Sequence, residues 1–460
     1  MAYRRPLHKA RSPTAIAWRA AICNELTVGP PTIGTSQCKG DFMTTTPADV
    51  DPLFDPDVVQ DPYDYYRYLR ENDPVHQVAG TGAYLVTRAE TIFDVVGRPE
   101  VFSSMSGDFL HKGDWSAPAL RPITSGYSVG DNGGGGVATV DPPDHGRQRK
   151  VVTHKLSTAN MRAMEPEFRA LVDNAMGDIS ADGSFEWMSR VAEPLPMVMV
   201  ARILGLPDAL APHLKKQGYA SVERISGFVS EDRIKQLEHD AMDDLAPVIE
   251  AYTRAKEDST AYSAAMIGIL AQAVVNGELN DVEAISILTV LIAAGGESTT
   301  SLTGTAVRLL AERPDIQDRL RTDPSLVPAF VEEACRFDPP FRGHYRVTTQ
   351  DVELEGTMLP AGSHLVLMWP AANRDPAAYE SPDEVRLDRP NPRHHLGFGW
   401  GIHLCVGAPL ARIEAKVAIE TLLARTRSFA IDPAAPPLRY HASLMVRRLV
   451  SLPLLLELAE

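Results

Sequence analysis

The chain has 460 residues, of which 44% are hydrophobic, and a formal net charge of −15 at pH 7. That length exceeds one average domain, although large single-domain enzymes also reach it, and the apolar content is ample for a large core. Residues 1–42 carry six basic and two acidic side chains, whereas the remainder carries 39 basic and 58 acidic ones. An acidic body of this kind argues against nucleic acid as a partner.

Cysteine usage favours a reducing, cytoplasmic location, because four scattered cysteines do not make a disulfide framework. They are Cys23, Cys38, Cys335 and Cys405. No run approaches the roughly 20 apolar residues that cross a bilayer, so we expect no membrane span. Residues 1–42 contain arginine and few acids, like a transit peptide. The alternatives are a disordered N-terminal extension or an upstream start codon, with the working chain beginning near Met43. We favour the latter, because Met43-Thr-Thr-Thr-Pro resembles an N-terminus, and expect 43–460 to form one domain.

The first part of that domain alternates between patterned and unpatterned segments. Apolar spacing predicts a short amphipathic helix over residues 61–70, and a hairpin over 75–86 with a glycine turn at 80–82. Residues 103–140 show little periodicity and much Gly, Ser and Pro, which in a compact protein is typical of functional or disordered loops. The Gly133–Gly136 run lacks the strand and helix of a dinucleotide fingerprint, so we expect a hinge.

Prolines and acids at 141–144 predict the start of a helix. His145 and Arg149 lie four residues apart and therefore share a face of that helix. Taken alone this cluster is a solvated basic face, and Arg147 is expected at the surface. Residues 159–277 are predicted to form several helices, one of them a buried segment after Pro196 whose methionines fill the core.

A helix of roughly 30 residues, about 45 Å long, is predicted to follow the caps and first-turn acids of 280–283. It is apolar almost all round and should be buried. Its middle contains Gly295, Gly296, Glu297, Ser298 and Thr299, and each glycine costs about 1 kcal/mol relative to alanine in a helix. A functional site would explain the run. A close helix crossing, with both hydroxyls bonded to the preceding turn, is the alternative.

A further helix is expected over 325–337, with Glu333 and Arg336 three residues apart on one face. At a surface such a pair contributes little. Strands are then predicted around Arg346, over 352–369 in short pieces, and in a small C-terminal β element over 439–456.

Cys405 lies in a glycine-rich loop that leads into a helix after Pro409. Gly399, Gly401 and Gly407 give that loop backbone freedom. A cysteine at a helix N-terminus favours the thiolate, and a thiolate facing a flat apolar surface suits axial ligation of haem iron. A lone cysteine is more often a small buried hydrophobe. A zinc site formed by Cys405 with His394, His395 and His403 is a weaker interpretation, since structural zinc sites usually have paired cysteines.

The whole array decides between these interpretations. Phe398-x-x-Gly401-x-His403-x-Cys405-x-Gly407, ending in Leu-Ala-Arg412, resembles the haem-binding loop of the cytochrome P-450 monooxygenases of the soluble bacterial type. The similarity runs from about Asp51 to the C-terminus, with four motifs in the family's order. It implies a mainly α fold with a small β-rich part (the triangular haem-thiolate prism), one catalytic domain over 43–460, and haem b (iron protoporphyrin IX) bound through Cys405.

The same resemblance implies roles for other residues. Glu297 relays protons, and Ser298 stands where the family usually has threonine, with Thr299 about 100° further round the helix. Phe398 and Gly407 shape the haem loop. The haem carboxylates are bound by His145, Arg149, Arg346 and His403. Glu333 and Arg336 belong to a buried ion network, completed by Arg389 or His394.

The implied reaction inserts one oxygen atom of O2 into a small organic substrate, by hydroxylation or oxidative dealkylation. No flavin or nicotinamide motif is present, so electrons are expected from a ferredoxin-type partner and its reductase. That partner would meet Arg393, Arg412 and Lys416. Four residues are candidates for the substrate pocket: Phe109, Leu110, Trp115 and Ile123. A peroxide-driven haem-thiolate peroxygenase and a non-catalytic haem sensor are the alternatives.

Overall fold

The computed structural model describes residues 50–113, 117–122, 136–177, 179–258, 260 and 262–459. All of them lie in one unit, Thr46–Glu460. Seven positions singled out above lie outside the described residues, namely Cys23, Cys38, Trp115, Ile123 and the first three glycines of the 133–136 run. The expected boundary near Met43 and the nature of residues 1–42 therefore stay predictions.

Helices make up most of the described chain, as the sequence predicts. They are α1 (Pro56–Gln60), α2 (Tyr63–Asn72), α3 (Ala89–Gly97), α4 (Asp144–Thr153), α5 (Thr158–Ala163), α6 (Glu165–Ala175), α7 (Leu195–Leu204), α8 (Ala211–Arg224), α9 (Glu231–Glu257), α10 (Met266–Val275), α11 (Asp281–Glu312), α12 (Pro314–Thr322), α13 (Val327–Phe337), α14 (Trp369–Ala372) and α15 (Ala408–Arg425). Short helical turns are η1 (Pro52–Phe54), η2 (Met188–Ala192), η3 (Asp208–Leu210), η4 (Pro324–Leu326), η5 (Leu396–Phe398) and η6 (Gly401–His403).

The largest sheet has five strands in the order β1-β2-β10-β7-β3. Their bounds are Val75–Gln77, Ala83–Val86, His364–Met368, Gly343–Thr348 and Phe102–Ser103. β1 and β2 form the predicted hairpin, with Val75 opposite Val86. β7 pairs antiparallel with β10, so that Leu367 lies opposite His344. Because side chains alternate along a strand, His344 and Arg346 of β7 point to the same face.

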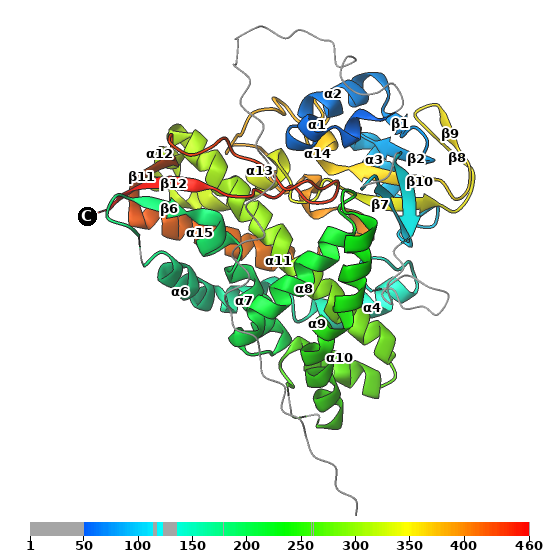
Figure 1. Ribbon diagram of the computed structural model, residues 1–460, viewed down its shortest axis with the longest axis horizontal. Coiled ribbons are helices and arrows are strands. Elements are labelled where there is room, and N and C mark those ends of the chain that lie inside the picture. Colours follow the sequence, from blue (N-terminus) through cyan, green and yellow to red (C-terminus); the bar gives the residue numbers. More distant parts are fainter. Residues whose placement is uncertain are drawn as a thin grey trace, which may run out of the picture. The chain divides into compact units, whose positions relative to one another are not determined.

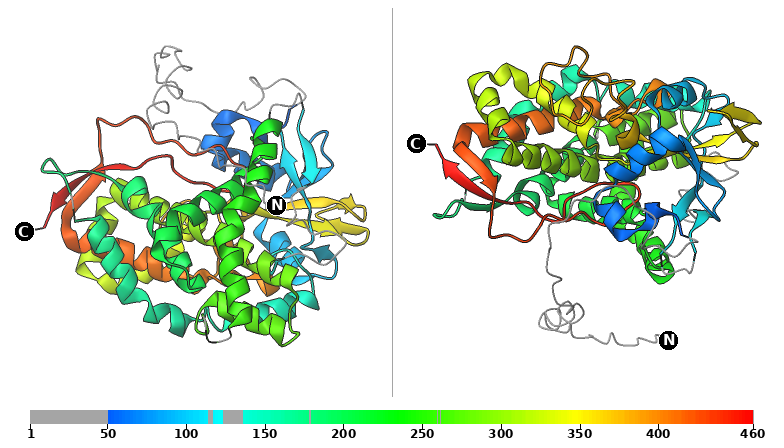
Figure 2. Two further views of the ribbon diagram at one scale, coloured as in Figure 1. Left: turned by 60° about the horizontal axis from the view of Figure 1, so that its bottom comes forward. Right: turned by 90° about the horizontal axis from the view of Figure 1, so that it is seen from above.

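Three smaller sheets complete the β part. Their strands are β4 (Asp108–His111) with β5 (Ala119–Pro122), β8 (Val352–Leu354) with β9 (Thr357–Leu359), and β11 (Thr426–Ile431) with β12 (Pro453–Leu458) and β6 (Ser184–Glu186). β11 and β12 lie at one end of the unit, and the β8–β9 hairpin lies at the opposite end (Figures 1 and 2). The β4–β5 hairpin falls in a segment that we expected to lack regular structure. The prediction missed it because strands of four residues are too short for the alternation of their side chains to be recognised.

The long helix α11 begins with a capping box, in which Asn280 and Glu283 bond each other's backbone N–H groups. By length and composition alone α11 is long and apolar enough to cross a membrane, whereas we expected no segment to be so. It is instead a core helix: 56% of its most apolar stretch is buried within the protein, among α7, α8, α13 and α15. A Cβ atom on Gly296 would lie 2.3 Å from the Met197 side chain of α7, so glycine permits this close crossing.

Candidate active site

Cys405 lies between η6 and the first turn of α15, and its backbone N–H donates to the Phe398 carbonyl at 2.8 Å. This bond closes the loop over Gly399 and Gly401, whose φ angles of +69° and +71° are in the left-handed region that favours glycine. Gly407 has an ordinary φ of −83°, so the conformational freedom expected there is not used. The loop thus presents its cysteine at the N-terminal end of α15, as predicted.

The Cys405 side chain retains accessible surface, although protein surrounds it closely enough for desolvation to dominate its ionisation. Burial raises the pKa of the thiol. The backbone N–H groups of Gly407 and Ala408 and the charges of Arg412 and Arg149 oppose this rise. The effect of the helix N-terminus that the sequence suggested is therefore present, but in the protein alone it is weaker than desolvation.

Four residues from three distant segments meet beside this loop: His145 and Arg149 of α4, Arg346 of β7 and His403 of η6, hereafter the donor cluster. The rings of His145 and His403 have centroids 4.2 Å apart, and Arg149 Nη2 donates to the Leu404 carbonyl at 2.6 Å. Burial, reinforced by Arg346 and its neighbours, lowers the pKa of His403 to about 3. The cluster therefore offers two permanent cations and two neutral imidazoles near pH 7.

The donor cluster contains buried nitrogen atoms that lack partners. Within the described part of the chain, Nε2 of His145 and both ring nitrogens of His403 make no hydrogen bond. Buried polar atoms in folded proteins almost always have one. The cluster is accordingly suited to a ligand that brings oxygen acceptors, such as carboxylates.

A fifth residue, His344, belongs to the same neighbourhood and was missed by the sequence analysis. Its imidazole interacts electrostatically with that of His403, which places it beside the cluster. Trp369 Nε1 donates to His344 Nδ1 at 2.7 Å. The signal was available, since a residue two positions before Arg346 in a strand must share its face.

Glu297 of α11 is buried and pairs with Arg448, whose Nε lies 3.0 Å from Glu297 Oε1. Arg448 Nη1 also contacts Glu193 Oε1 at 3.0 Å, and Glu193 pairs in turn with Lys215. Desolvation raises the pKa of Glu297 above its usual value, while Arg448 opposes the rise. The acid of α11 is thus held in a buried ion chain that the sequence did not reveal, because its arginine is 151 residues away.

The two hydroxyls that follow Glu297 lie on different faces of α11. Ser298 is partly accessible and lies on the same face of α11 as the exposed Ala294, one turn earlier. Its Oγ donates to the Ala294 carbonyl at 2.6 Å. Thr299 is buried toward Glu414 of α15. The α-helix is continuous through this segment.

Comparisons with known proteins agree with this geometry. The family model described as Cytochrome P450 matches residues 228–453. "Cytochrome P450 144" of Mycobacterium tuberculosis is 39% identical over 418 residues, which cover 90% of this chain and 93% of that protein. The chain belongs to the cytochrome P450 family. Vitamin D3 dihydroxylase of Streptomyces griseolus is 31% identical, covering 83% of this chain and 91% of that enzyme.

Solved structures give the same family. CYP109Q5 from Chondromyces apiculatus superposes with a TM-score of 0.74 at 29% identity, covering 88% of this chain and 98% of that one. CYP109E1 from Bacillus megaterium, in complex with testosterone, gives 0.73 at 25% identity, covering 87% and 99%. The fold class predicted from the sequence is therefore confirmed.

Cytochromes P450 bind haem b through a cysteine thiolate, and this chain is a haem-thiolate monooxygenase. The described residues fit that cofactor. Cys405 has accessible surface just before α15, and the unpartnered nitrogens of the donor cluster suit a cofactor that carries two carboxylates. The turns at Gly399 and Gly401 and the start of α15 after Cys405 are compatible with this cofactor.

The predicted ion network forms around Glu333 of α13. Arg336 donates twice to Glu333, from Nε at 2.9 Å and Nη2 at 2.8 Å, and Arg389 Nε binds the same carboxylate at 2.8 Å. Arg389 is thus the third partner. His394 instead stacks on Phe93, with ring centroids 5.1 Å apart.

A second network uses the neighbouring carboxylate, Glu332. It accepts from Arg412 Nε at 2.7 Å, from His395 and from Arg393. These contacts lower the pKa of Glu332 to about 2, although burial opposes them. Arg412 also lies 4.4 Å from the centroid of the Phe398 ring, so this network is tied to the Cys405 loop.

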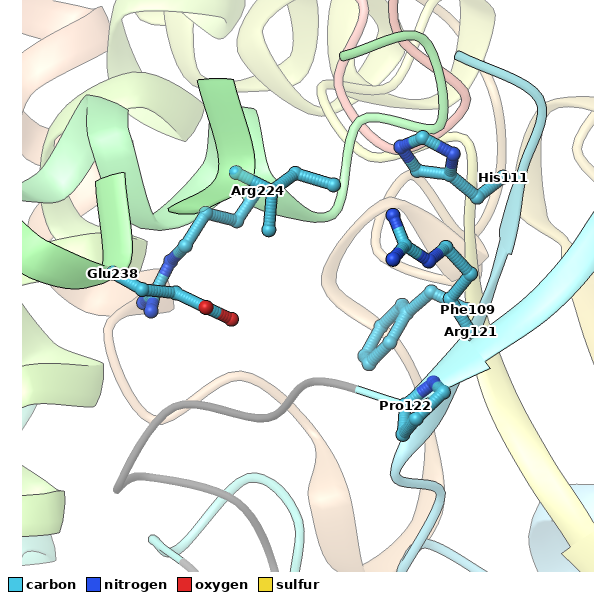
Figure 3. Close-up of a pocket in the computed structure, with 7 residues that line it drawn as sticks. Phe109, His111, Arg121, Pro122, Arg224 and Glu238 are labelled. Carbon is cyan, nitrogen blue, oxygen red and sulfur yellow. The ribbon is translucent and has the colours of Figure 1, made fainter. Parts of the chain in front are cut away.

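A small pocket with a cavity volume of about 80 Å³ opens between the β4–β5 hairpin and helices α8 and α9. In Figure 3, Phe109, His111, Arg121 and Pro122 face Arg224 and Glu238 across this space. Phe109 therefore lines this pocket, and its role in substrate binding stays a prediction. Leu110 does not line it, because it points to the opposite face of β4 and is buried in the core.

Proposed function

We propose that this monooxygenase inserts one oxygen atom of O2 into a small organic substrate, by hydroxylation or oxidative dealkylation, with Cys405 as the iron ligand. The observation that carries the assignment of the site is the convergence of α4, β7 and η6 on the Cys405 loop, with three buried nitrogens that have no partner among the described residues. In this proposal His145, Arg149, Arg346 and His403 bind the haem carboxylates.

Haem b held by a thiolate supplies the redox chemistry that activates dioxygen. The chain's own residues would deliver the protons. Desolvation raises the pKa of Glu297, which makes its carboxyl group easier to protonate near neutral pH than an ordinary one. Arg448 keeps that carboxyl in one place and sets how readily it takes up a proton.

Ser298 is the hydroxyl that this arrangement favours for passing the proton on. It is adjacent to Glu297 in the chain, and it lies on the accessible side of α11 with Ala294. Its Oγ–H is bonded to the Ala294 carbonyl, which orients the hydroxyl. Thr299 faces α15, so the burial pattern gives it a packing role.

For the electron donor we propose a ferredoxin-type protein with its reductase. Arg393 suits such a partner, because its side chain is 76% exposed at the edge of the Glu332 network. Arg412 is engaged by Glu332, and Lys416 by Glu165 at 3.0 Å, so both are less free to meet a partner than we expected. A partner's acidic residues would compete with these internal contacts. A cytoplasmic location fits this electron supply.

The test of the site is the absorption difference spectrum of the reduced protein with carbon monoxide. We expect a strongly red-shifted Soret band that is lost in Cys405→Ala. Cys335→Ala is the matched control, since Cys335 is fully buried within α13 and should leave the band in place. An unchanged band in Cys405→Ala would overturn the assignment.

Turnover separates the proposed reaction from a peroxide-driven one. With a panel of apolar substrates, product should require ferredoxin, reductase and O2, and should incorporate one atom of labelled dioxygen. Product formed equally well with hydrogen peroxide alone would favour the peroxygenase.

A further inference from the structure

His344 lies at the edge of the donor cluster and makes a hydrogen bond that fixes its ring. The indole N–H of Trp369 can only donate, so His344 Nδ1, 2.7 Å away, must be the acceptor. In a neutral imidazole the proton is then on Nε2. The other ring nitrogen is consequently a donor.

The surroundings keep this ring neutral and in place. Trp369 is buried, and Phe341 also packs against His344, with ring centroids 5.1 Å apart. Burial, with Arg346 nearby, lowers the pKa of His344 to about 4. A protonated ring would place an N–H against the Trp369 N–H, which also disfavours the cation.

The Nε2 side of the ring has no partner. Nε2 makes no hydrogen bond with any described residue, and the His344 side chain keeps accessible surface even though the strand around it is buried. His344 shares a face of β7 with Arg346 and contributes to the electrostatics of His403. A donor of fixed tautomer thus opens onto the neighbourhood of the four predicted carboxylate-binding residues.

We propose that His344, held as its Nε2–H tautomer by Trp369, is a fifth member of the donor cluster and donates from Nε2 to a cofactor carboxylate. This rests on the proposed position of the haem. A neutral donor adds a hydrogen bond without adding a third positive charge beside Arg149 and Arg346. A hydrogen bond to an ionised carboxylate typically changes binding by about tenfold or more.

The test compares two cofactors in the same holoprotein. Wild type and variants are loaded with haem b or with its dimethyl ester, which cannot present ionised carboxylates, and the rate of haem loss to an excess of a haem-scavenging protein is measured. His344→Phe should speed the loss of haem b about tenfold and leave the loss of the dimethyl ester unchanged. His344→Gln, which can still accept from Trp369 and donate, should stay within about threefold of wild type.

Trp369→Phe removes the group that fixes the tautomer and should give an intermediate increase, seen with haem b alone. Equal acceleration with both cofactors in His344→Phe would mean that the residue only packs, and unchanged haem b loss would equally overturn the proposal. A failure of the proposed site looks different: the red-shifted carbon monoxide band would then persist in Cys405→Ala.

Discussion

The buried chain of Glu193, Arg448 and Glu297 gives the sharpest test of how α11 holds its acid. Arg448→Met removes the charge while keeping most of the side-chain volume beside Tyr219. Glu193 retains Lys215, but Glu297 loses its only counter-charge among the described residues. Breaking a buried ion pair costs about 3–5 kcal/mol.

Protonation of Glu297 limits this loss. Keeping the carboxyl neutral at pH 7, when the unfolded chain would ionise it, costs about 3–4 kcal/mol. The pKa of Glu297 is already raised in the wild type and rises further in the variant, so the variant loses stability as pH rises. We therefore expect a loss of about 3 kcal/mol at pH 7 that becomes smaller as the pH falls to 5, by at most roughly 1.4 kcal/mol per pH unit.

Urea unfolding of the haem-loaded protein, followed by far-UV circular dichroism at pH 5, 6, 7 and 8, measures these differences. Arg393→Met is the matched control, because it removes an exposed ionic contact to Glu332 and should cost at most about 1 kcal/mol. Adding Glu297→Gln to Arg448→Met should recover most of the loss and abolish its pH dependence. A loss that is equal at pH 5 and pH 7, or a double variant no better than the single one, would refute the reasoning.

Three further predictions follow from neighbouring contacts. Glu414 is fully buried without a well-formed hydrogen bond, and burial raises its pKa well above the usual value, so stability falls as pH rises above about 4. Glu414→Gln should therefore stabilise the protein by about 1–2 kcal/mol at pH 7 and by nothing near pH 4 in urea unfolding, with the exposed Glu71→Gln as an unchanged control. Arg336→Leu should destabilise the haem-loaded protein by about 3–5 kcal/mol, because the buried Glu333 is left with Arg389 as its counter-charge and the Asn373 carbonyl loses this donor, whereas Arg67→Leu in the exposed pair with Asp64 should cost under about 1 kcal/mol. Ser298→Ala should lower product formed per electron pair consumed by about tenfold or more and Thr299→Ala by less than about twofold; the reverse order would contradict the placement of the two hydroxyls.

Local chemistry allowed much of the site to be predicted. The capping box at Asn280 and Glu283, the helix after Pro409 and the left-handed turns at Gly399 and Gly401 depend on residues within a few positions of one another. Such interactions leave a direct pattern in the chain. Family resemblance added the long-range pairing of α4, β7 and the Cys405 loop, which no periodicity contains.

Partner choice between distant segments was much harder to foresee. The sequence offered Arg389 and His394 equally as companions of Glu333, and only the packed structure shows that His394 is taken by Phe93. In the same way the residues near Glu297 in the sequence do not predict its pairing with Arg448, and those near Glu332 do not predict its pairing with Arg412. Each choice is made by tertiary packing that brings one of many arginines within reach.

The run Gly295–Thr299 shows that a correct prediction can depend on an incomplete reason. Two glycines in a buried helix suggested a functional site, with close helix crossing as the alternative, yet the structure contains the crossing: Gly296 lies against Met197, and a Cβ atom on Gly295 would meet Val200 at 2.7 Å. The glycines are therefore explained by packing on α7. What marks this part of α11 as a site is the opposite side of the same turn, where Ala294 and Ser298 keep accessible surface in the middle of a largely buried helix. Glu297, beside them in the chain, is held by the charge of Arg448. Close packing of one face of α11 on α7 fixes the helix and thereby positions the other face. The close helix crossing and the functional site are therefore two sides of the same helical turn.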